Sequence, residues 1–225
     1  MKKFVVIVAG GSGSRMKSDI PKQFLVLNGI PVLMHTIQKF HKSFNGSITV
    51  ILVLPVNQHT YWNELCEKYN FDLPHIIAGG GNSRMHSVEN GLKKINEEGI
   101  VAIHDGVRPL ISEEVIRNSF YAAEKHGSGV VCVPPKDSLR KISDNNRNIT
   151  QAVNRSDYLL VQTPQTFRVK DIKEAFVKAD NYNFTDDASV YENAGQNIHV
   201  IIGNYDNIKI TTPEDLVIAE SLIGK

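Results

Sequence analysis

The sequence has two cysteines, one tryptophan, no long apolar run and almost no excess of either charge sign. Cys66 and Cys132 stand far apart and neither belongs to a C-x-x-C pair, which argues against a disulfide framework and a zinc site. No apolar stretch approaches the length of a membrane span, and a first strand that starts by Phe4 leaves no room for a targeting peptide. We therefore expect a cytoplasmic protein with reduced thiols and no membrane partner.

The overall charge is equally uninformative about partners. The formal net charge is +1, so no general field attracts nucleic acid and any phosphate recognition must be local. Charged residues make up 22% and hydrophobic residues 41% of the 225, as in ordinary globular proteins, which excludes a disordered chain. We find no internal repeat and no linker, which favours a single domain over residues 1–225.

A glycine-rich loop after the first apolar run is the feature around which the other motifs are arranged. Phe4 to Val8 has the composition of a buried parallel strand, and Ala9-Gly10-Gly11-Ser12-Gly13-Ser14-Arg15-Met16 follows it. Glycines let the backbone approach an anion because no Cβ intervenes. Arg15 and Lys22 add two positive charges, so the stretch predicts a polyphosphate site.

Two well-known glycine loops do not fit this stretch. A P-loop needs Gly-Lys-Ser or Gly-Lys-Thr, which the chain lacks. A dinucleotide loop counted from Gly11 would need a third glycine where Met16 stands, and the second strand, ending near Leu54, offers no acidic residue for a ribose. A glycine turn without a ligand remains the alternative.

Apolar runs alternate with amphipathic segments along most of the chain. We predict further strands at 48–54, 75–77, 100–103, 129–133 and 199–202, and regular structure again at 159–162. Helices are predicted near 32–41, 60–69, 84–95, 113–126, 169–179, 186–193 and from 212 onward. Such alternation predicts an α/β fold with a doubly wound, mostly parallel, Rossmann-like sheet.

The alternation breaks between residues 134 and 158. This segment is polar, with short β-like pieces at 138–142 and 150–153 around a hairpin tip at 143–148. Its apolar content is too low for a core, so it is either a loose surface excursion or a protruding arm that packs on another subunit. We favour the arm, because long structureless loops are uncommon in compact domains.

Three predicted strands end in loops that carry chemistry. These loops hold the glycines with Arg15 and Lys22, then Gly79-Gly80-Gly81 with Ser87, then Asp105 with Arg108. The carboxyl ends of parallel strands share one sheet edge, so the loops converge. The set is rich in cations and backbone donors, and no Ser or Cys motif with a paired His presents itself. It therefore favours phosphoryl or nucleotidyl transfer, in which catalysis is mainly positioning and charge stabilisation.

At this point several motifs, in order along nearly the whole chain, are similar to a known family. The sequence resembles the 2-C-methyl-D-erythritol 4-phosphate cytidylyltransferases of the non-mevalonate isoprenoid pathway. The motifs are Ala9 to Met16 with Pro21-Lys22-Gln23-Phe24-Leu25, Arg84 with Ser87-Val88, His104-Asp105-Gly106-Val107-Arg108-Pro109, Arg155, Gln162-Thr163-Pro164-Gln165, Thr185-Asp186-Asp187-Ala188-Ser189 and Asn207-Ile208-Lys209.

The resemblance implies an enzyme that combines CTP with a sugar-alcohol phosphate to give a CDP-alcohol and pyrophosphate. The acceptor phosphate would attack the α-phosphorus in line, without a covalent enzyme intermediate. Mg²⁺ would be carried mainly by the CTP triphosphate, with no metal ligand implied in the protein. The resemblance also implies a homodimer formed through the 134–158 arm.

It further implies roles for individual residues. Arg15, Lys22 and Lys209 would be catalytic. The nucleotide would lie against Ala9, Gly10, Gly11, Gly13, Gly80, Gly81, Asn82 and Ser87. The acceptor would contact Asp105, Arg108, Ser138, Arg155, Thr163 and Thr185, with Arg155 reaching into the partner's site.

Some positions depart from the family pattern. Gly106-Val107 stands where Ala-Ala is frequent, and ribitol-5-phosphate cytidylyltransferases carry Ala-Val there, so ribitol 5-phosphate stays an alternative acceptor. The spacing of Arg15 and Lys22 favours the erythritol enzymes. Ser138 replaces a common threonine and keeps the hydroxyl, whereas Asn82 replaces a frequent acidic residue near the ribose. A nucleotide-binding regulatory module without turnover is the alternative from another class.

Three residues have competing interpretations. His104 is more readily a hydrogen-bonded structural residue than a metal ligand. Asp186 and Asp187 either cap the helix that begins there or belong to the site.

Overall fold

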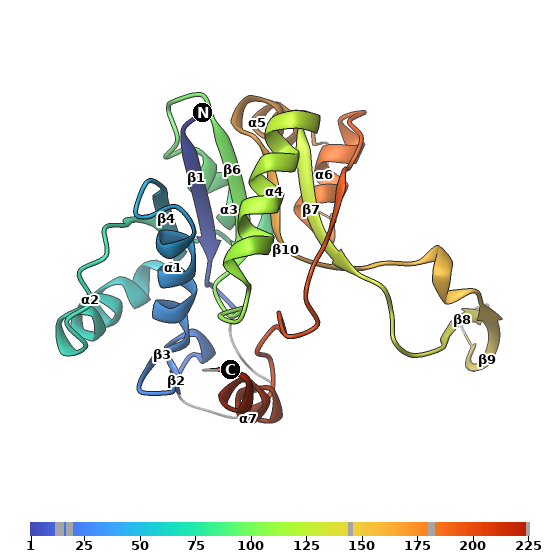
Figure 1. The fold of residues 1–225 in the computed structure, drawn as a ribbon, viewed down its shortest axis with the longest axis horizontal. Helices are drawn as coiled ribbons and strands as arrows, with labels where there is room; N and C mark the ends of the chain where they lie inside the picture. Colours follow the sequence, from blue (N-terminus) through green and yellow to red (C-terminus); the bar gives the residue numbers. More distant parts are fainter. Residues whose placement is uncertain (12–15, 17–19, 144–145, 180–182, 224–225) are drawn as a thin grey trace.

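A computed structural model describes residues 1–11, 16, 20–143, 146–179 and 183–223, and for 146–147 the backbone alone. Among these residues, seven strands form one sheet in the order β11-β7-β10-β6-β1-β4-β5 (Figure 1). The strands are β1 (Lys3–Val8), β4 (Thr49–Leu54), β5 (Ile76–Gly79), β6 (Ile100–Asp105), β7 (Ser128–Val133), β10 (Leu160–Arg168) and β11 (Val200–Ile202). The predicted α/β class and the predicted strand positions are confirmed.

The sheet is parallel except for β10. Strand β1 pairs in parallel with β4 and β6, β4 with β5, and β7 with β11. Strand β10 lies antiparallel between β6 and β7. The sequence pattern marked regular structure only over 159–162, because the polar residues Gln162, Thr163 and Gln165 interrupt the apolar run that continues to Arg168.

Helices cover both faces of the sheet. They are α1 (Val32–Ser43), α2 (His59–Lys68), α3 (Arg84–Leu92), α4 (Glu113–His126), α5 (Val169–Lys178), α6 (Asp187–Asn193) and α7 (Pro213–Leu222). Their ends follow the expected signals. The Ser112 side chain accepts a hydrogen bond from the Val115 N–H at the start of α4, and Gly127 takes φ 93° at its end.

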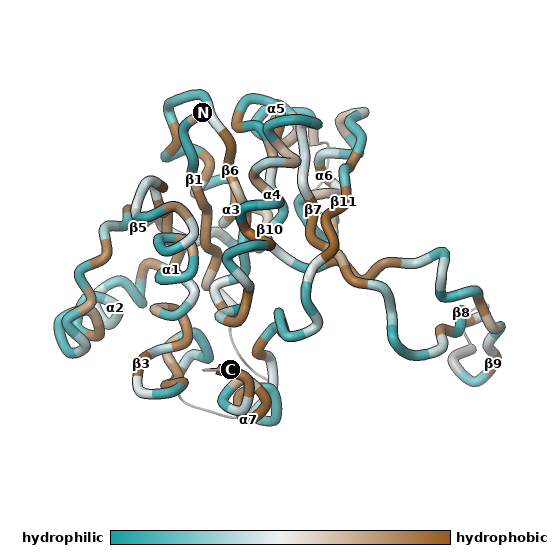
Figure 2. The backbone as a smooth tube through the Cα atoms, in the orientation of Figure 1, coloured by the Kyte–Doolittle hydropathy of each residue, from teal (hydrophilic) through white to brown (hydrophobic). Residues whose placement is uncertain are grey.

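The core has two layers because successive strand residues point to opposite faces. Val5, Ile7 and Leu52 pack with α1 and α4 on one face. Val6 and Ile103 pack with α3, α5 and α6 on the other. Figure 2 shows this apolar interior as brown tube along β1, β6 and β7. Each such side chain, fully buried, stabilises the fold by roughly 1.5–3 kcal/mol.

The states of the cysteines and the lengths of the described helices agree with the expectations from composition. Cys66 and Cys132 are both free, and burial raises the pKa of each thiol to about 11, which favours the protonated thiol near neutral pH. None of the described helices has the length and apolar character needed to cross a bilayer.

The break in the pattern at 134–158 is a projecting hairpin. Strands β8 (Leu139–Ser143) and β9 (Asn146–Val153) pair antiparallel in a sheet of their own, followed by a 3₁₀ turn, η4 (Arg155–Asp157). Figure 1 shows this arm extending away from the main sheet. The arm leaves the sheet at β7 and returns at β10, next to the edge where the predicted site lies.

Candidate active site

The three chemistry-bearing loops meet at the carboxyl edge of the sheet. They follow β1, β5 and β6, and together with Lys22 and Lys209 they surround a hollow of about 380 Å³, here called the first hollow. Its lining is Val8, Ala9, Gly10, Gly11, Lys22, Gln23, Gly81, Asn82, Ser83, Arg84, Ser87, Asp105, Val107 and Lys209. The predicted convergence of the loops is therefore observed.

Lys22 reaches the first hollow from a short, well-anchored turn. It begins the 3₁₀ turn η2 (Lys22–Phe24) and is only 8% exposed. Phe24 packs edge-on against Tyr61 at 5.2 Å and stacks on Trp62 at 6.1 Å. A Cβ placed on Gly11 would lie 3.5 Å from Lys22 Cε, so the lysine stem passes beside the first glycine loop.

The second glycine loop is held by its own hydrogen bonds. The Gly81 N–H donates to Ser87 Oγ at 3.0 Å, and the Ser87 hydroxyl donates to the Ser83 carbonyl at 2.9 Å. A Cβ on Gly81 would lie 2.4 Å from His86 Cβ, so only glycine fits there. Gly80 does not line the first hollow, and its N–H donates to Leu54 O at 2.7 Å.

Asp105 lies at the centre of the charged groups. Its carboxylate is 8% exposed, and among the described residues three cations surround it: Lys209 Nζ at 3.0 Å, Arg108 Nε at 3.3 Å and Arg84 Nε at 3.6 Å. Burial acts to raise the pKa of Asp105, but Lys209, Arg84 and Arg108 outweigh it and hold that pKa well below its usual value. Asp105 is therefore ionised and draws three cations to one place.

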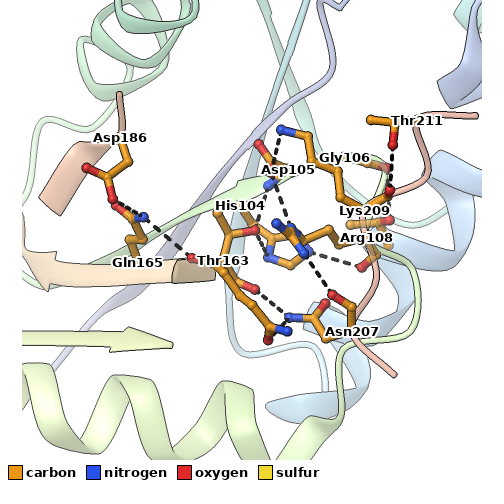
Figure 3. A network of polar contacts seen from close by, with 12 residues as sticks. His104, Asp105, Gly106, Arg108, Thr163, Gln165, Asp186, Asn207, Lys209 and Thr211 are labelled. Carbon is orange, nitrogen blue, oxygen red and sulfur yellow. Dashed lines mark hydrogen bonds and ion pairs between the residues drawn. The ribbon is translucent and has the colours of Figure 1, made fainter. Parts of the chain in front are cut away.

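A hydrogen-bonded clamp fixes the end of β6 against β10 (Figure 3). His104 is fully buried, with Nε2 3.2 Å from the Arg108 carbonyl and Nδ1 3.1 Å from Thr163 Oγ1. Because a carbonyl only accepts, Nε2 carries the proton, so Nδ1 of the neutral ring accepts from the Thr163 hydroxyl. The same hydroxyl accepts from the Asp105 N–H at 3.1 Å. The interpretation of His104 as a hydrogen-bonded structural residue is confirmed.

Asn207 extends this network to the last loop. It is fully buried, and its Nδ2 donates to Gln162 Oε1 and to the Thr163 carbonyl, both at 2.9 Å. Arg108 Nη1 donates to the Asn207 carbonyl at 2.8 Å. These bonds position Lys209, two residues further along the chain, at the mouth of the site (Figure 3).

A second hollow of about 280 Å³ adjoins the first. It is lined by Arg84, Asp105, Arg108, Val161, Gln162, Thr163, Gln165, Thr185, Asp186 and Lys209. Gln165 ties β10 to the start of α6, since its Nε2 donates to Asp186 Oδ2 at 3.0 Å and its Oε1 accepts from the Ala188 N–H at 2.8 Å. Asp186 is the N-cap of α6 and also lines the second hollow, so the structure bears out both interpretations of that residue.

Most of the predicted site residues line one of the two hollows, and a few do not. Ala9, Gly10, Gly11, Lys22, Gly81, Asn82, Ser87 and Lys209 line the first hollow, and Asp105, Arg108, Thr163 and Thr185 the second. Gly13 and Arg15 lie outside the described residues. Ser138 and Arg155 line neither hollow, and Arg155 Nη1 donates to the Lys136 carbonyl within the arm.

Arg84 and Asp187 form a pair at the site that was not among the predicted site residues. Arg84 lines both hollows, and its guanidinium makes a bidentate pair with Asp187, Nη1–Oδ1 3.0 Å and Nη2–Oδ2 2.7 Å. Asp187 is neither the cap of α6 nor part of the lining of either hollow; its carboxylate holds the Arg84 guanidinium instead. Arg84 and Asp187 each belong to one of the motifs listed above, which is the one sign in the sequence that they matter. No local pattern indicates that they pair.

The arrangement suits chemistry on phosphates. Four cationic side chains line two adjoining hollows, Lys22, Arg84 and Lys209 the first and Arg84, Arg108 and Lys209 the second, with the ionised Asp105 carboxylate between them. Preorganised charges of this kind stabilise negative charge that develops on transferring phosphoryl oxygens.

Comparison with known proteins identifies the family. The family model of 2-C-methyl-D-erythritol 4-phosphate cytidylyltransferase (IspD) matches residues 3–225. A protein of that name from Phocaeicola vulgatus is 49% identical over 223 residues, which are 99% of this chain and 100% of the relative. Another from Clostridium botulinum is 42% identical over 98% of both chains.

Solved structures agree. The crystal structure of 4-diphosphocytidyl-2C-methyl-D-erythritol synthase from Anaerococcus prevotii has a TM-score of 0.84 at 29% identity, over 99% of this chain and 96% of that one. That of the cytidylyltransferase from Thermus thermophilus has a TM-score of 0.81 at 28% identity, over 99% and 98%. The chain belongs to the 2-C-methyl-D-erythritol 4-phosphate cytidylyltransferase family.

Proposed function

We propose that this protein transfers the cytidylyl group of CTP to 2-C-methyl-D-erythritol 4-phosphate. The products are 4-diphosphocytidyl-2-C-methyl-D-erythritol and pyrophosphate. Besides family membership, one observation carries the proposal: Lys22 and Lys209 enter the first hollow beside the glycine loops, while Asp105 and Arg108 line the adjoining one. A nucleoside triphosphate in the first hollow and a phosphorylated alcohol in the second would meet at their shared wall.

The reaction is a direct displacement. An oxygen of the acceptor phosphate attacks the α-phosphorus of CTP, the bond between that phosphorus and the bridging oxygen to the β-phosphate breaks, and the electron pair leaves with pyrophosphate. The pentacoordinate transition state gathers negative charge on its equatorial oxygens, so fixed cations bind it more tightly than the ground state. Lys22 and Lys209 supply such charge, as does Arg15 by the family resemblance.

Lys209 connects the two substrates in this scheme. Its Nζ lies 3.0 Å from Asp105 Oδ2, and its side chain is 41% exposed. A phosphate entering either hollow competes with Asp105 for this cation. Asp105, held by Arg84 and Arg108 as well, stays ionised and accepts hydrogen bonds from acceptor hydroxyls.

Mg²⁺ enters with the triphosphate. Among the described residues no cluster of three or more ligating side chains is preformed. Mg²⁺ in nucleotide enzymes commonly keeps several waters and binds through substrate phosphates with one or two carboxylates. We propose that CTP carries the ion, as the family resemblance implies, and that the ion offsets the triphosphate charge.

The arm supports a homodimer. Tyr158, Leu159, Leu160 and Val161, at its junction with β10, are each 44–48% exposed, and Ile142 and Ile149 on the arm are 51% and 58% exposed. A continuous exposed apolar run of this kind marks an interaction surface. In the dimer, Arg155 reaches the second hollow of the partner, which fits its absence from the lining of both hollows of its own chain.

The Gly106-Val107 departure does not favour ribitol 5-phosphate. A Cβ on Gly106 would lie 2.8 Å from Ala9 Cβ and 3.0 Å from Leu33 Cδ1. Glycine at this position thus follows from packing beneath the first glycine loop. Gly106 lines neither hollow, and Val107 lines the first hollow but not the second, so the departure lies outside the proposed acceptor hollow.

Pyrophosphate release tests the function directly. The protein, CTP and Mg²⁺ are combined with 2-C-methyl-D-erythritol 4-phosphate or with ribitol 5-phosphate, and pyrophosphate is measured. We expect release with the first acceptor. Release with ribitol 5-phosphate alone would assign the alternative activity, and CTP binding without release with either would favour the regulatory module.

A further inference from the structure

The two hollows share one wall. Arg84, Asp105 and Lys209 line both of them. If the proposed function holds, this wall is where the acceptor phosphate and the α-phosphate of CTP meet. Each of the three side chains is thus placed to control the alignment of the reacting groups.

Arg84 is held far more firmly than Lys209. Both terminal nitrogens of its guanidinium engage the Asp187 carboxylate at 2.7–3.0 Å, and its Nε lies 3.6 Å from Asp105 Oδ1. Asp187 is 1% exposed. A bidentate pair of this kind fixes orientation as well as charge. With two carboxylates facing it, Arg84 is suited to hold its neighbours in place and poorly suited to bind a phosphate.

The pair joins three parts of the site. Arg84 is the first residue of α3, directly after the second glycine loop. Asp187 is the first residue of α6, two residues after Thr185 of the second hollow. Asp105 ends β6 between them. One guanidinium therefore links the nucleotide loop, the acceptor loop and the central strand.

We propose that Arg84 is a positioning residue that sets the spacing between the two hollows through Asp187 and Asp105. It aligns the acceptor phosphate with the α-phosphate without touching either. In-line displacement needs reacting atoms near 3–3.5 Å, and a misplacement of about 1 Å costs on the order of 10²-fold in rate. Loss of Arg84 should therefore lower kcat more than it weakens CTP binding.

A purely structural role must be separated from this one. Arg84→Gln alone leaves Asp187 buried without its cation, which destabilises the fold whatever else it does. The double variant Arg84→Gln with Asp187→Asn replaces the ion pair by two amides that can still hydrogen-bond. Arg84→Lys keeps the positive charge but cannot form the two parallel hydrogen bonds that the guanidinium donates to Asp187. Neither the double variant nor Arg84→Lys leaves a buried, unpaired carboxylate at position 187. Both remove the bidentate pair that fixes the guanidinium.

The experiment compares these variants with the wild type in pyrophosphate release, equilibrium CTP binding and thermal unfolding. We expect Arg84→Gln to lower both Tm and kcat. In the double variant and in Arg84→Lys, Tm should recover most of the loss, whereas kcat stays about 10–100-fold down and the Kd for CTP changes less than about threefold. The control is Arg117→Gln, because the exposed ion pair of Arg117 with Glu113 at 3.5 Å lies outside both hollows. This variant should leave kcat, the Kd for CTP and Tm unchanged.

Three outcomes would overturn the inference. Recovery of kcat together with Tm would reduce the pair to a structural ion pair. A loss of CTP affinity as large as the loss of kcat would place Arg84 in direct contact with the nucleotide. A wild type inactive with 2-C-methyl-D-erythritol 4-phosphate would refute the proposed function and the inference with it, a result visible before any variant is made.

Discussion

Asp105 is a buried charge whose desolvation is offset by its neighbours. Taking a carboxylate out of water costs several kcal/mol, which close cations recover only when the geometry is good. Lys209 at 3.0 Å and Arg108 at 3.3 Å both face Oδ2, while Arg84 faces Oδ1. Because the cations share one carboxylate, an incoming phosphate changes the balance among all of them.

Lys22 provides the residue-scale test of catalysis. Lys22→Ala should lower kcat by about 10²–10³, the cost of losing one preorganised transition-state donor, while the KM for the acceptor changes only a few-fold. Steady-state pyrophosphate release measures both quantities. The matched control is the exposed Lys94→Ala. If KM rises and kcat stays constant, Lys22 binds ground state and transition state equally and our assignment is wrong.

Individual side chains also show where sequence reasoning ends. Lys22, Lys209 and Arg108 were predictable, as was Asp105, since each follows a predicted strand or belongs to a distinct motif, whereas the role of Arg84 was not. The engagement of Thr163 was not. Its hydroxyl is 4% exposed and bonded to His104 and to the Asp105 N–H, so it holds β6 and β10 together as well as lining the second hollow. These partners lie 58 and 59 residues away in sequence, and no local pattern reveals them.

At the scale of elements, sequence signals correctly predicted turns and helix ends, because neighbouring residues alone determine these features. Asn-Gly is a strong local turn signal, and Asn28 and Gly29 do form a turn, with φ 44° and 90°. Thr212 and Pro213 open α7 as predicted. The direction of β10 depends instead on which strands it joins. That information is non-local, so the antiparallel insertion was missed although the strand itself was partly predicted.

The arm gives the element-scale prediction. Arg155→Ala and Lys22→Ala subunits are inactive alone, but mixed one to one they should recover about a quarter of wild-type activity. Half of the randomly formed dimers are mixed, and each holds one intact composite site. Subunit exchange followed by pyrophosphate release measures this.

A cis–trans control sharpens the result. A subunit carrying both substitutions is mixed one to one with wild type. If Arg155 acts across the dimer, mixed dimers are dead and about a quarter of the activity remains, whereas action within one chain leaves about half. An inactive first mixture with proven heterodimers, or half-activity in the second, would contradict sharing between subunits.

At the scale of the whole molecule, burial of His104 links the site to stability. Burial in the core, with the charges of Arg108 and Lys209 nearby, outweighs the opposing effect of Asp105 and lowers the pKa of His104 from 6.5 to about 4. The unfolded chain therefore binds a proton more readily than the folded one between these values. Stability from this group is complete above pH 6.5 and is lost as the pH falls toward 4.

Unfolding at different pH values tests this linkage. Between pH 6.5 and pH 4 the free energy of unfolding should fall by up to about 3 kcal/mol through His104 alone. Burial also lowers the pKa of His35 and His41, so the comparison is with His104→Asn, which should show a shallower slope in the same interval. Equal slopes in denaturant titrations of both proteins would show that His104 is not the titrating group.

The register of β7 and β10 has one more consequence. Leu160 lies directly opposite Val133 in the antiparallel ladder. Strands β7 and β10 therefore form a β-hairpin, and the arm is its long connection. A short turn between these two residues would close the same ladder, with the same register and the same neighbours for Thr163. The arm can thus lengthen or shorten during evolution without shifting the strand that carries Thr163, provided that Arg155 still reaches the second hollow of the partner.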